Sequence, residues 1–154
     1  MPKLSRSEIE AYKNNGYVIP NYTISEKMLR ALKQALEETL DINSNIRPEQ
    51  LASIHTEKSS KEDTVGHPTF LDTALNPDLV DLVSSVLGDD IIMWGVQVFC
   101  KPGSDGMEVP MHQDGQYWPI RPLKTCTMWL AIDDADRLNG CLQVIPGSHL
   151  GSIH

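Results

Sequence analysis

The triplet His112-Gln113-Asp114 holds the side chains in this sequence that are best suited to metal chemistry. If the segment is a β-strand, residues i and i+2 share one face, so the imidazole and the carboxylate converge while Gln113 points the other way. These groups make up two-thirds of a 2-His-1-carboxylate facial triad, which leaves positions on iron(II) open for a co-substrate and O₂. Taken alone, the triplet is more simply interpreted as a polar pair on a surface strand.

The residues around the triplet form a longer pattern. Residues 109–119 have the sequence VPMHQDGQYWP, and Trp129 follows on the next predicted strand. Residues 139–149 have the sequence NGCLQVIPGSH, and FCKPG precedes the triplet at 99–103. This order and spacing closely resemble the phytanoyl-CoA dioxygenase family from about residue 91 to 149, and only in general terms before that.

The resemblance implies a non-haem iron(II) oxygenase that uses 2-oxoglutarate and O₂ and hydroxylates an unactivated C–H bond of a small molecule. It also implies a double-stranded β-helix, the cupin-like jelly roll. His112 and Asp114 would be the first two iron ligands, and no catalytic residue beyond the metal ligands is expected. Asp114 favours hydroxylation or desaturation over halogenation, because related halogenases lack this carboxylate.

The resemblance further implies roles for residues near the predicted metal pair. Gln97 and Trp129 match positions beside 2-oxoglutarate, although Gln97 could be an ordinary sheet residue and Trp129 a core residue. Tyr117 and Trp118 are candidates for the substrate wall, and exposed loop aromatics would give the same pattern. The sequence does not separate these alternatives.

The sequence departs from the family after the motif. The family's third ligand, a histidine, and an arginine that pairs with the distal carboxylate of 2-oxoglutarate come several strands later. His149 closes the Pro-Gly-Ser-His turn and His154 is the last residue, and we expect neither to complete the triad. We therefore expect a truncated version of a longer enzyme, with weak iron(II) binding and little or no turnover. The alternatives are an inactive fragment and a cupin-like β protein without oxygenase activity.

The elements that position the triplet belong to one incomplete domain, residues 1–154, which divides into two parts. Residues 1–90 are predicted to be mainly helical. A capping box is present at Ser5-Arg6-Ser7-Glu8, and apolar residues recur at three- and four-residue steps after Ser25. Asn76-Pro77 supplies a cap and a first-turn proline for a further helix.

Residues 91–154 are predicted to hold the first strands of the jelly roll. β-Branched and aromatic residues are frequent here, and the candidate strands are 91–100, 111–114, 125–132 and 141–145. Asn139-Gly140 should form a turn in which the asparagine takes the left-handed conformation. Helices followed by a run of strands indicate an α+β fold.

Charge and composition exclude several classes of function. The formal net charge of −8 over 154 residues argues against binding to nucleic acid or to an anionic membrane. Cys100, Cys126 and Cys141 match no zinc or redox spacing and indicate reduced thiols in a cytoplasmic setting. No signal peptide or membrane span is expected. The expected partner is a small-molecule substrate, and the sequence selects neither its identity nor the oligomeric state.

Overall fold

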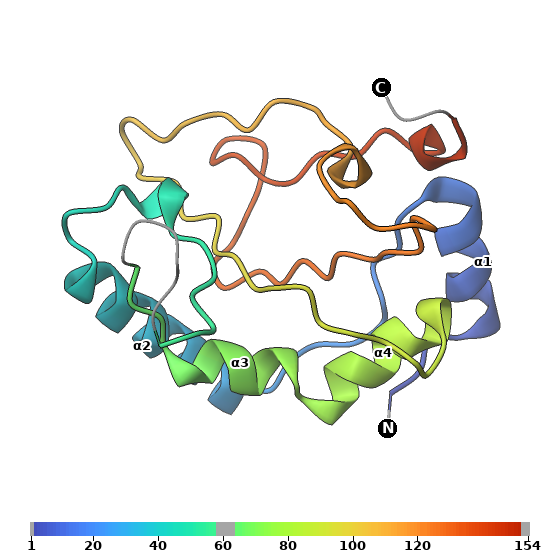
Figure 1. Cartoon of the computed structure of the whole chain (residues 1–154), viewed down its shortest axis with the longest axis horizontal. Coiled ribbons are helices and arrows are strands. Elements are labelled where there is room, and N and C mark those ends of the chain that lie inside the picture. Colours follow the sequence, from blue (N-terminus) through green and yellow to red (C-terminus); the bar gives the residue numbers. More distant parts are fainter. Residues whose placement is uncertain (1, 58–63, 152–154) are drawn as a thin grey trace.

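The computed structural model describes residues 2–57 and 64–151. Its α-helices are α1 (Arg6–Asn15), α2 (Glu26–Ile42), α3 (Pro68–Ala74) and α4 (Pro77–Leu87). Its 3-10 helices are η1 (Pro48–Gln50), η2 (Asp114–Gln116) and η3 (Ser148–Leu150). Figure 1 shows α2, α3 and α4 along one side of the molecule, with the extended segments of the later residues on the other.

Short-range signals determine where the predicted helices begin and end. Ser5 and Glu8 form the capping box of α1: Glu8 N donates to Ser5 Oγ at 3.3 Å, and Ser5 N donates to Glu8 Oε2 at 2.7 Å. α1 ends at Gly16, whose φ of 83° is left-handed. The side chains of Ser25 and Asn76 cap α2 and α4. The predicted helices of the first part are therefore confirmed.

Helix α3 was not predicted. Its N-cap is His67, whose Nδ1 accepts from Thr69 N at 3.2 Å, and Pro68 occupies the first turn. Because Nδ1 accepts, the proton of a neutral ring sits on Nε2, which lies 3.0 Å from Glu38 Oε2 on α2. Histidine is not among the favoured N-cap residues, so the sequence signal for this helix was weak.

The main core lies between α2, α3 and the segments that follow them. Its buried members are Leu32, Ala35, Leu51, Ile54, Phe70 and Val98. The predicted apolar stripe of α2 supplies Leu32 to this core, and Met28, Leu36 and Leu40 of the same stripe pack against it. A second cluster, Leu4, Leu79 and Leu82, joins the N-terminal segment to α4.

The predicted strands do not form a sheet in the described part of the chain. One isolated antiparallel bridge pairs Ala52 with Gln97, and no ladder joins the described segments 91–100, 111–114, 125–132 and 141–145. A strand requires hydrogen bonds to a neighbour, so a segment of strand composition without a paired neighbour stays extended only. The observed architecture is helices plus extended segments, and the expected jelly roll is not seen among these residues.

The extended segments nevertheless keep the two-residue alternation of strands. The core-facing positions are Val96, Val98, Cys100, Leu130 and Ile132, which all belong to the main core or pack against it. The positions between them, Gln97, Phe99, Trp129 and Ala131, are exposed. The face that carries Gln97 and Trp129 is therefore turned away from the helices.

The turn at Asn139-Gly140 forms, but with different roles for its two residues. Gly140 takes the left-handed conformation, with a φ of 85°, and the prediction that Asn139 does so is wrong. Asn139 instead accepts from Asp136 N at 2.7 Å through Oδ1 and donates to Asp134 O at 2.7 Å through Nδ2. Glycine adopts a positive φ without steric cost, which leaves the asparagine side chain to hold the turn together.

The three cysteine thiols form no disulfide with one another, as the sequence predicts. Cys100, Cys126 and Cys141 are all unpaired and half-buried. Among residues 2–57 and 64–151, none of the helices has the length and apolar character needed to cross a bilayer.

A charged cluster ties η1 to the turn at 101–106. Arg47 Nη2 lies 3.0 Å from Glu49 Oε1, and Arg47 Nη1 lies 3.3 Å from Asp105 Oδ2. Met107 N donates to the same Glu49 oxygen at 3.1 Å. The hydrogen bond from Arg47 is the largest reason that the pKa of Glu49 falls to about 2.

We expect this cluster to hold the turn at neutral pH and to release it in acid. Because the pKa of Glu49 is lowered, its stabilisation is complete above the ordinary value of 4.5 and is lost as the pH falls toward about 2. Protection of the Met107 amide from hydrogen exchange should decrease over that range. Glu49→Gln should remove most of this protection already at pH 7, whereas the neighbouring Glu108→Gln should not. Equal protection in wild type and Glu49→Gln at pH 7 would show that the cluster does not hold the turn.

Candidate metal centre

His112 and Asp114 face each other. His112 Nε2 lies 3.1 Å from Asp114 Oδ1, and His112 Nδ1 lies 2.8 Å from Pro110 O. A carbonyl oxygen can only accept, so Nδ1 donates to Pro110 O, and Nε2 is the nitrogen that faces the Asp114 carboxylate. Metal-binding histidines usually have this arrangement, with one nitrogen donating to a carbonyl and the other free for the ion.

Thr127 orients the carboxylate of Asp114. Its Oγ1 donates to Asp114 Oδ2 at 2.9 Å, which leaves Oδ1 directed at His112. The role of Thr127 was not predicted from the sequence. Thr127 lies two positions before Trp129 in a segment predicted to alternate, so the spacing could have placed both on one face.

The residue between the pair points elsewhere, as the spacing predicts. Gln113 Nε2 donates to Ser148 O in η3 at 3.2 Å. The local backbone is a short extended stretch, with a φ of −116° and a ψ of 120° at Gln113, and Asp114 then begins η2. The two ligand candidates thus converge without the sheet that was expected to align them.

The pair is open to solvent and stands without a third ligand in the described residues. The side chains of His112 and Asp114 are 34% and 44% exposed. No group of three or more His, Cys, Asp or Glu residues there could hold a metal ion. Imidazole nitrogen and carboxylate oxygen suit iron(II), so the pair fits two of the three protein ligands of a facial triad.

Of the two later histidines, the structure describes only His149, which lies at the end of α1 and not at the pair. His149 Nε2 lies 2.9 Å from Lys13 O, at the end of α1. His154 lies outside the described residues. That the histidine of the Pro-Gly-Ser-His turn is not a metal ligand stays a prediction.

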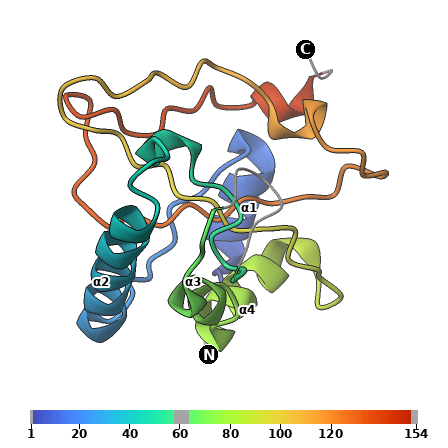
Figure 2. The same ribbon diagram turned by 60° about the vertical axis from the view of Figure 1, so that its left-hand side comes forward.

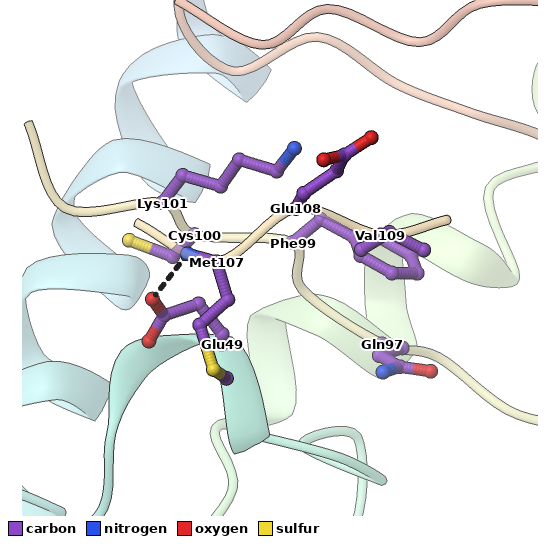
Figure 3. Close-up of a pocket in the computed structure, with 8 residues that line it drawn as sticks. All are labelled: Glu49, Gln97, Phe99, Cys100, Lys101, Met107, Glu108 and Val109. Carbon is purple, nitrogen blue, oxygen red and sulfur yellow. Dashed lines mark hydrogen bonds between the residues drawn. The ribbon is translucent and has the colours of Figure 1, made fainter. Parts of the chain in front are cut away.

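Gln97 lines a shallow pocket of about 250 Å³ between η1 and the turn at 101–106, shown in Figure 3. Its lining residues are Glu49, Gln97, Phe99, Cys100, Lys101, Met107, Glu108 and Val109. Figure 3 shows the Lys101 amine and the Glu108 carboxylate on the opposite side of the pocket from Glu49. Neither His112 nor Asp114 lines this pocket, so the structure does not bring Gln97 and the metal pair into one cavity.

The predicted aromatic residues differ in their relation to the pair. The ring of Tyr117 lies 6.0 Å from that of His112, centre to centre, at an interplanar angle of 63°, which is an edge-to-face contact. Trp118 is half-buried. Trp129 is 44% exposed, and Gln97 forms the isolated bridge with Ala52.

Comparison with known proteins gives a consistent result. A probable phytanoyl-CoA dioxygenase of Caenorhabditis elegans is 26% identical over 97% of this chain and 54% of the relative. The peroxisomal phytanoyl-CoA dioxygenase of Bos taurus is 24% identical over 97% of this chain and 49% of the relative. That of Homo sapiens is 37% identical over 50% of this chain and 24% of the relative. No solved structure matches the chain significantly.

The chain spans about half the length of the first two of these relatives. The family model for phytanoyl-CoA dioxygenase (PhyH) matches residues 12–154, which include all of α2, α3 and α4 and the His112–Asp114 pair. Because this match covers most of the sequence, the chain belongs to the phytanoyl-CoA dioxygenase (PhyH) family of dioxygenases.

Proposed function

We propose that this chain carries the first two metal ligands of an iron(II)- and 2-oxoglutarate-dependent dioxygenase that hydroxylates an unactivated C–H bond of a small molecule. The observation that carries the proposal is the 3.1 Å approach of His112 Nε2 to Asp114 Oδ1. The remaining polar atom of each side chain is held by the protein, through Pro110 O and Thr127 Oγ1. Two groups fixed in this way can share one ion with little rearrangement.

The chain's own residues would then have distinct roles. His112 would hold the ion through Nε2 and Asp114 through Oδ1, and iron(II) with 2-oxoglutarate would supply the activation of O₂. The candidates for contacts to 2-oxoglutarate are Gln97 and Trp129, on the face turned away from the core. The candidates for the substrate wall are Tyr117 and Trp118, which follow the pair directly.

We also propose that the third histidine, the arginine and the remaining jelly-roll strands belong to a segment that corresponds to the part of the relatives outside the match. Large apolar side chains are exposed in the later half of the described chain, including Trp94, Phe99, Leu142, Val144 and Ile145. Apolar surface of this extent is normally covered by protein. With two protein ligands, residues 1–154 alone should bind iron(II) weakly and turn over little or no substrate.

The unpaired cysteines support a cytoplasmic location.

The proposal predicts that 2-oxoglutarate acts at the metal held by this pair. Under anaerobic conditions, 2-oxoglutarate should change the absorption spectrum of the iron(II)-loaded chain, and Asp114→Ala should remove the change. A longer protein that contains this chain and the remaining strands should release succinate when its substrate is present. Metal binding without any response to 2-oxoglutarate would instead favour a cupin-like protein that is not an oxygenase. A metal affinity that is unchanged when His112 or Asp114 is replaced by alanine would contradict the proposal.

A further inference from the structure

The last turn of α1 is joined to the His112–Asp114 pair by two separate sets of contacts. Figures 1 and 2 both show η3 beside the C-terminal end of α1. The second set ends on the Thr127–Asp114 hydrogen bond that the proposed function uses, whereas the contacts at α1 play no part in that proposal. Each set can be followed contact by contact from the helix to one of the two ligand candidates.

The first set begins with the carbonyl groups at the end of α1. The last four carbonyls of an α-helix have no partner within the helix. In α1, Lys13 O accepts from His149 Nε2 at 2.9 Å. Asn15 O accepts from Gly147 N at 2.8 Å. The Pro-Gly-Ser-His turn therefore acts as a C-terminal cap that is supplied from far along the chain.

Gly16 allows the histidine ring to come this close. Its φ of 83° is left-handed, and a Cβ added there would lie 2.5 Å from His149 Nδ1. A side chain at this position would be disfavoured both by the backbone and by the ring. From η3 the contacts continue to the metal pair, because Ser148 O accepts from Gln113 Nε2 at 3.2 Å. Gln113 is the residue between the two ligand candidates.

The second set begins at Tyr12, the residue before Lys13 in α1. The hydroxyl of Tyr12 lies beside the thiol of Cys126, near enough for each group to influence the pKa of the other. Burial raises the pKa of both groups, so both are neutral at physiological pH and one can donate to the other. The residue after Cys126 is Thr127, whose hydroxyl donates to Asp114 Oδ2 at 2.9 Å.

We propose that the last turn of α1 positions the metal pair, with Tyr12 and His149 as the positioning residues. The consequence for metal binding rests on the proposed function, but the positioning itself is a property of the metal-free chain. Among the described residues no sheet aligns the segments that carry the pair. A helix end that contacts both segments supplies the rigid support that a ligand site needs.

Conservative variants separate the two sets of contacts. Tyr12→Phe removes the hydroxyl alone, and Tyr17→Phe is its matched control, because Tyr17 lies just beyond α1 and is 38% exposed. His149→Ala removes the donor to Lys13 O. His149→Gln keeps an N–H donor and should restore part of what the alanine variant loses.

The first readout needs no metal. Within η2, Gln116 N donates to Gln113 O and Tyr117 N donates to Asp114 O, each at 3.0 Å. Amide exchange at Gln116 and Tyr117 should accelerate about 3- to 10-fold in Tyr12→Phe and His149→Ala, the factor that corresponds to one lost hydrogen bond. Tyr17→Phe should leave it unchanged.

The second readout is the affinity for Mn(II), used as a spectroscopically visible substitute for iron(II). It should weaken about 3- to 10-fold in Tyr12→Phe and His149→Ala, and roughly 10-fold or more in Thr127→Val, which removes a direct partner of Asp114. His149→Gln should recover part of the loss.

Two different failures can be told apart. Unchanged exchange at Gln116 and Tyr117, together with unchanged Mn(II) affinity, would overturn the positioning role even if the variants melted earlier, because a purely structural role lowers thermal stability alone. If Mn(II) affinity is indifferent to Asp114→Ala, the proposed function fails, and the exchange rates still decide whether α1 positions the pair.

Discussion

Replacing His112 or Asp114 with alanine should abolish specific iron(II) binding to this chain. The two groups converge to 3.1 Å, and the described residues hold no group of three potential ligands that could take over. Loss of one ligand leaves a single protein atom on the ion, so the affinity should fall by more than the roughly 10- to 100-fold that loss of a group behind a ligand costs. Anaerobic calorimetric titration measures this change.

The control for this experiment is Asp90→Ala, which removes an exposed carboxylate beyond the end of α4. It lowers the negative charge of the chain by the same amount as Asp114→Ala. Equal affinities in Asp114→Ala and Asp90→Ala would mean that iron(II) responds to net charge and that the pair is not its site.

Phe70→Ala should cause the largest loss of stability among the changes considered. Phe70 is 3% exposed and shares the main core with Val98, the neighbour of Gln97. Truncation of a buried phenylalanine removes its transfer free energy and leaves a cavity, which lowers the free energy of unfolding by about 3–5 kcal/mol. Urea denaturation at pH 7 measures the change, and the same variant should loosen the segment that carries Gln97.

Leu75→Ala is the matched control, because Leu75 ends the same helix, α3, and is 55% exposed. Its effect should stay within about 0.5 kcal/mol, as for most surface substitutions. Comparable losses in the two variants would show that Phe70 does not belong to the core that supports the extended segments.

The helices were predictable because their signals are local. The caps of α1, α2 and α4 are formed by hydrogen bonds of Ser5, Ser25 and Asn76 to residues at most three positions away, so a short window of sequence contains each cap. Helix α3 was missed because His67 is an uncommon cap whose second contact, to Glu38, lies 29 residues away.

The extended segments show which part of strand prediction is local. Alternation determines which side chains share a face, and it is present at Val96, Val98 and Cys100. Pairing depends on a neighbouring strand, which the composition of a segment cannot supply. This is why a segment can keep the alternation of a strand although the predicted sheet is not seen among the described residues.

The same distinction holds at the candidate metal centre. The spacing of His112 and Asp114 predicts that they converge, since two residues on one side of an extended chain are close whatever surrounds them. The contribution of Thr127 and the contact between His149 and Lys13, which are 136 residues apart, depend on tertiary packing. No short-range pattern contains that information.

The most direct test of the central claim is pulsed EPR of the Mn(II)-loaded chain with ¹⁵N-labelled histidine. We predict a coupling to one directly bound imidazole nitrogen, which is lost in His112→Ala and retained in His149→Ala. If the coupling survives in His112→Ala, or if no imidazole nitrogen is bound at all, then His112 and Asp114 do not hold the metal.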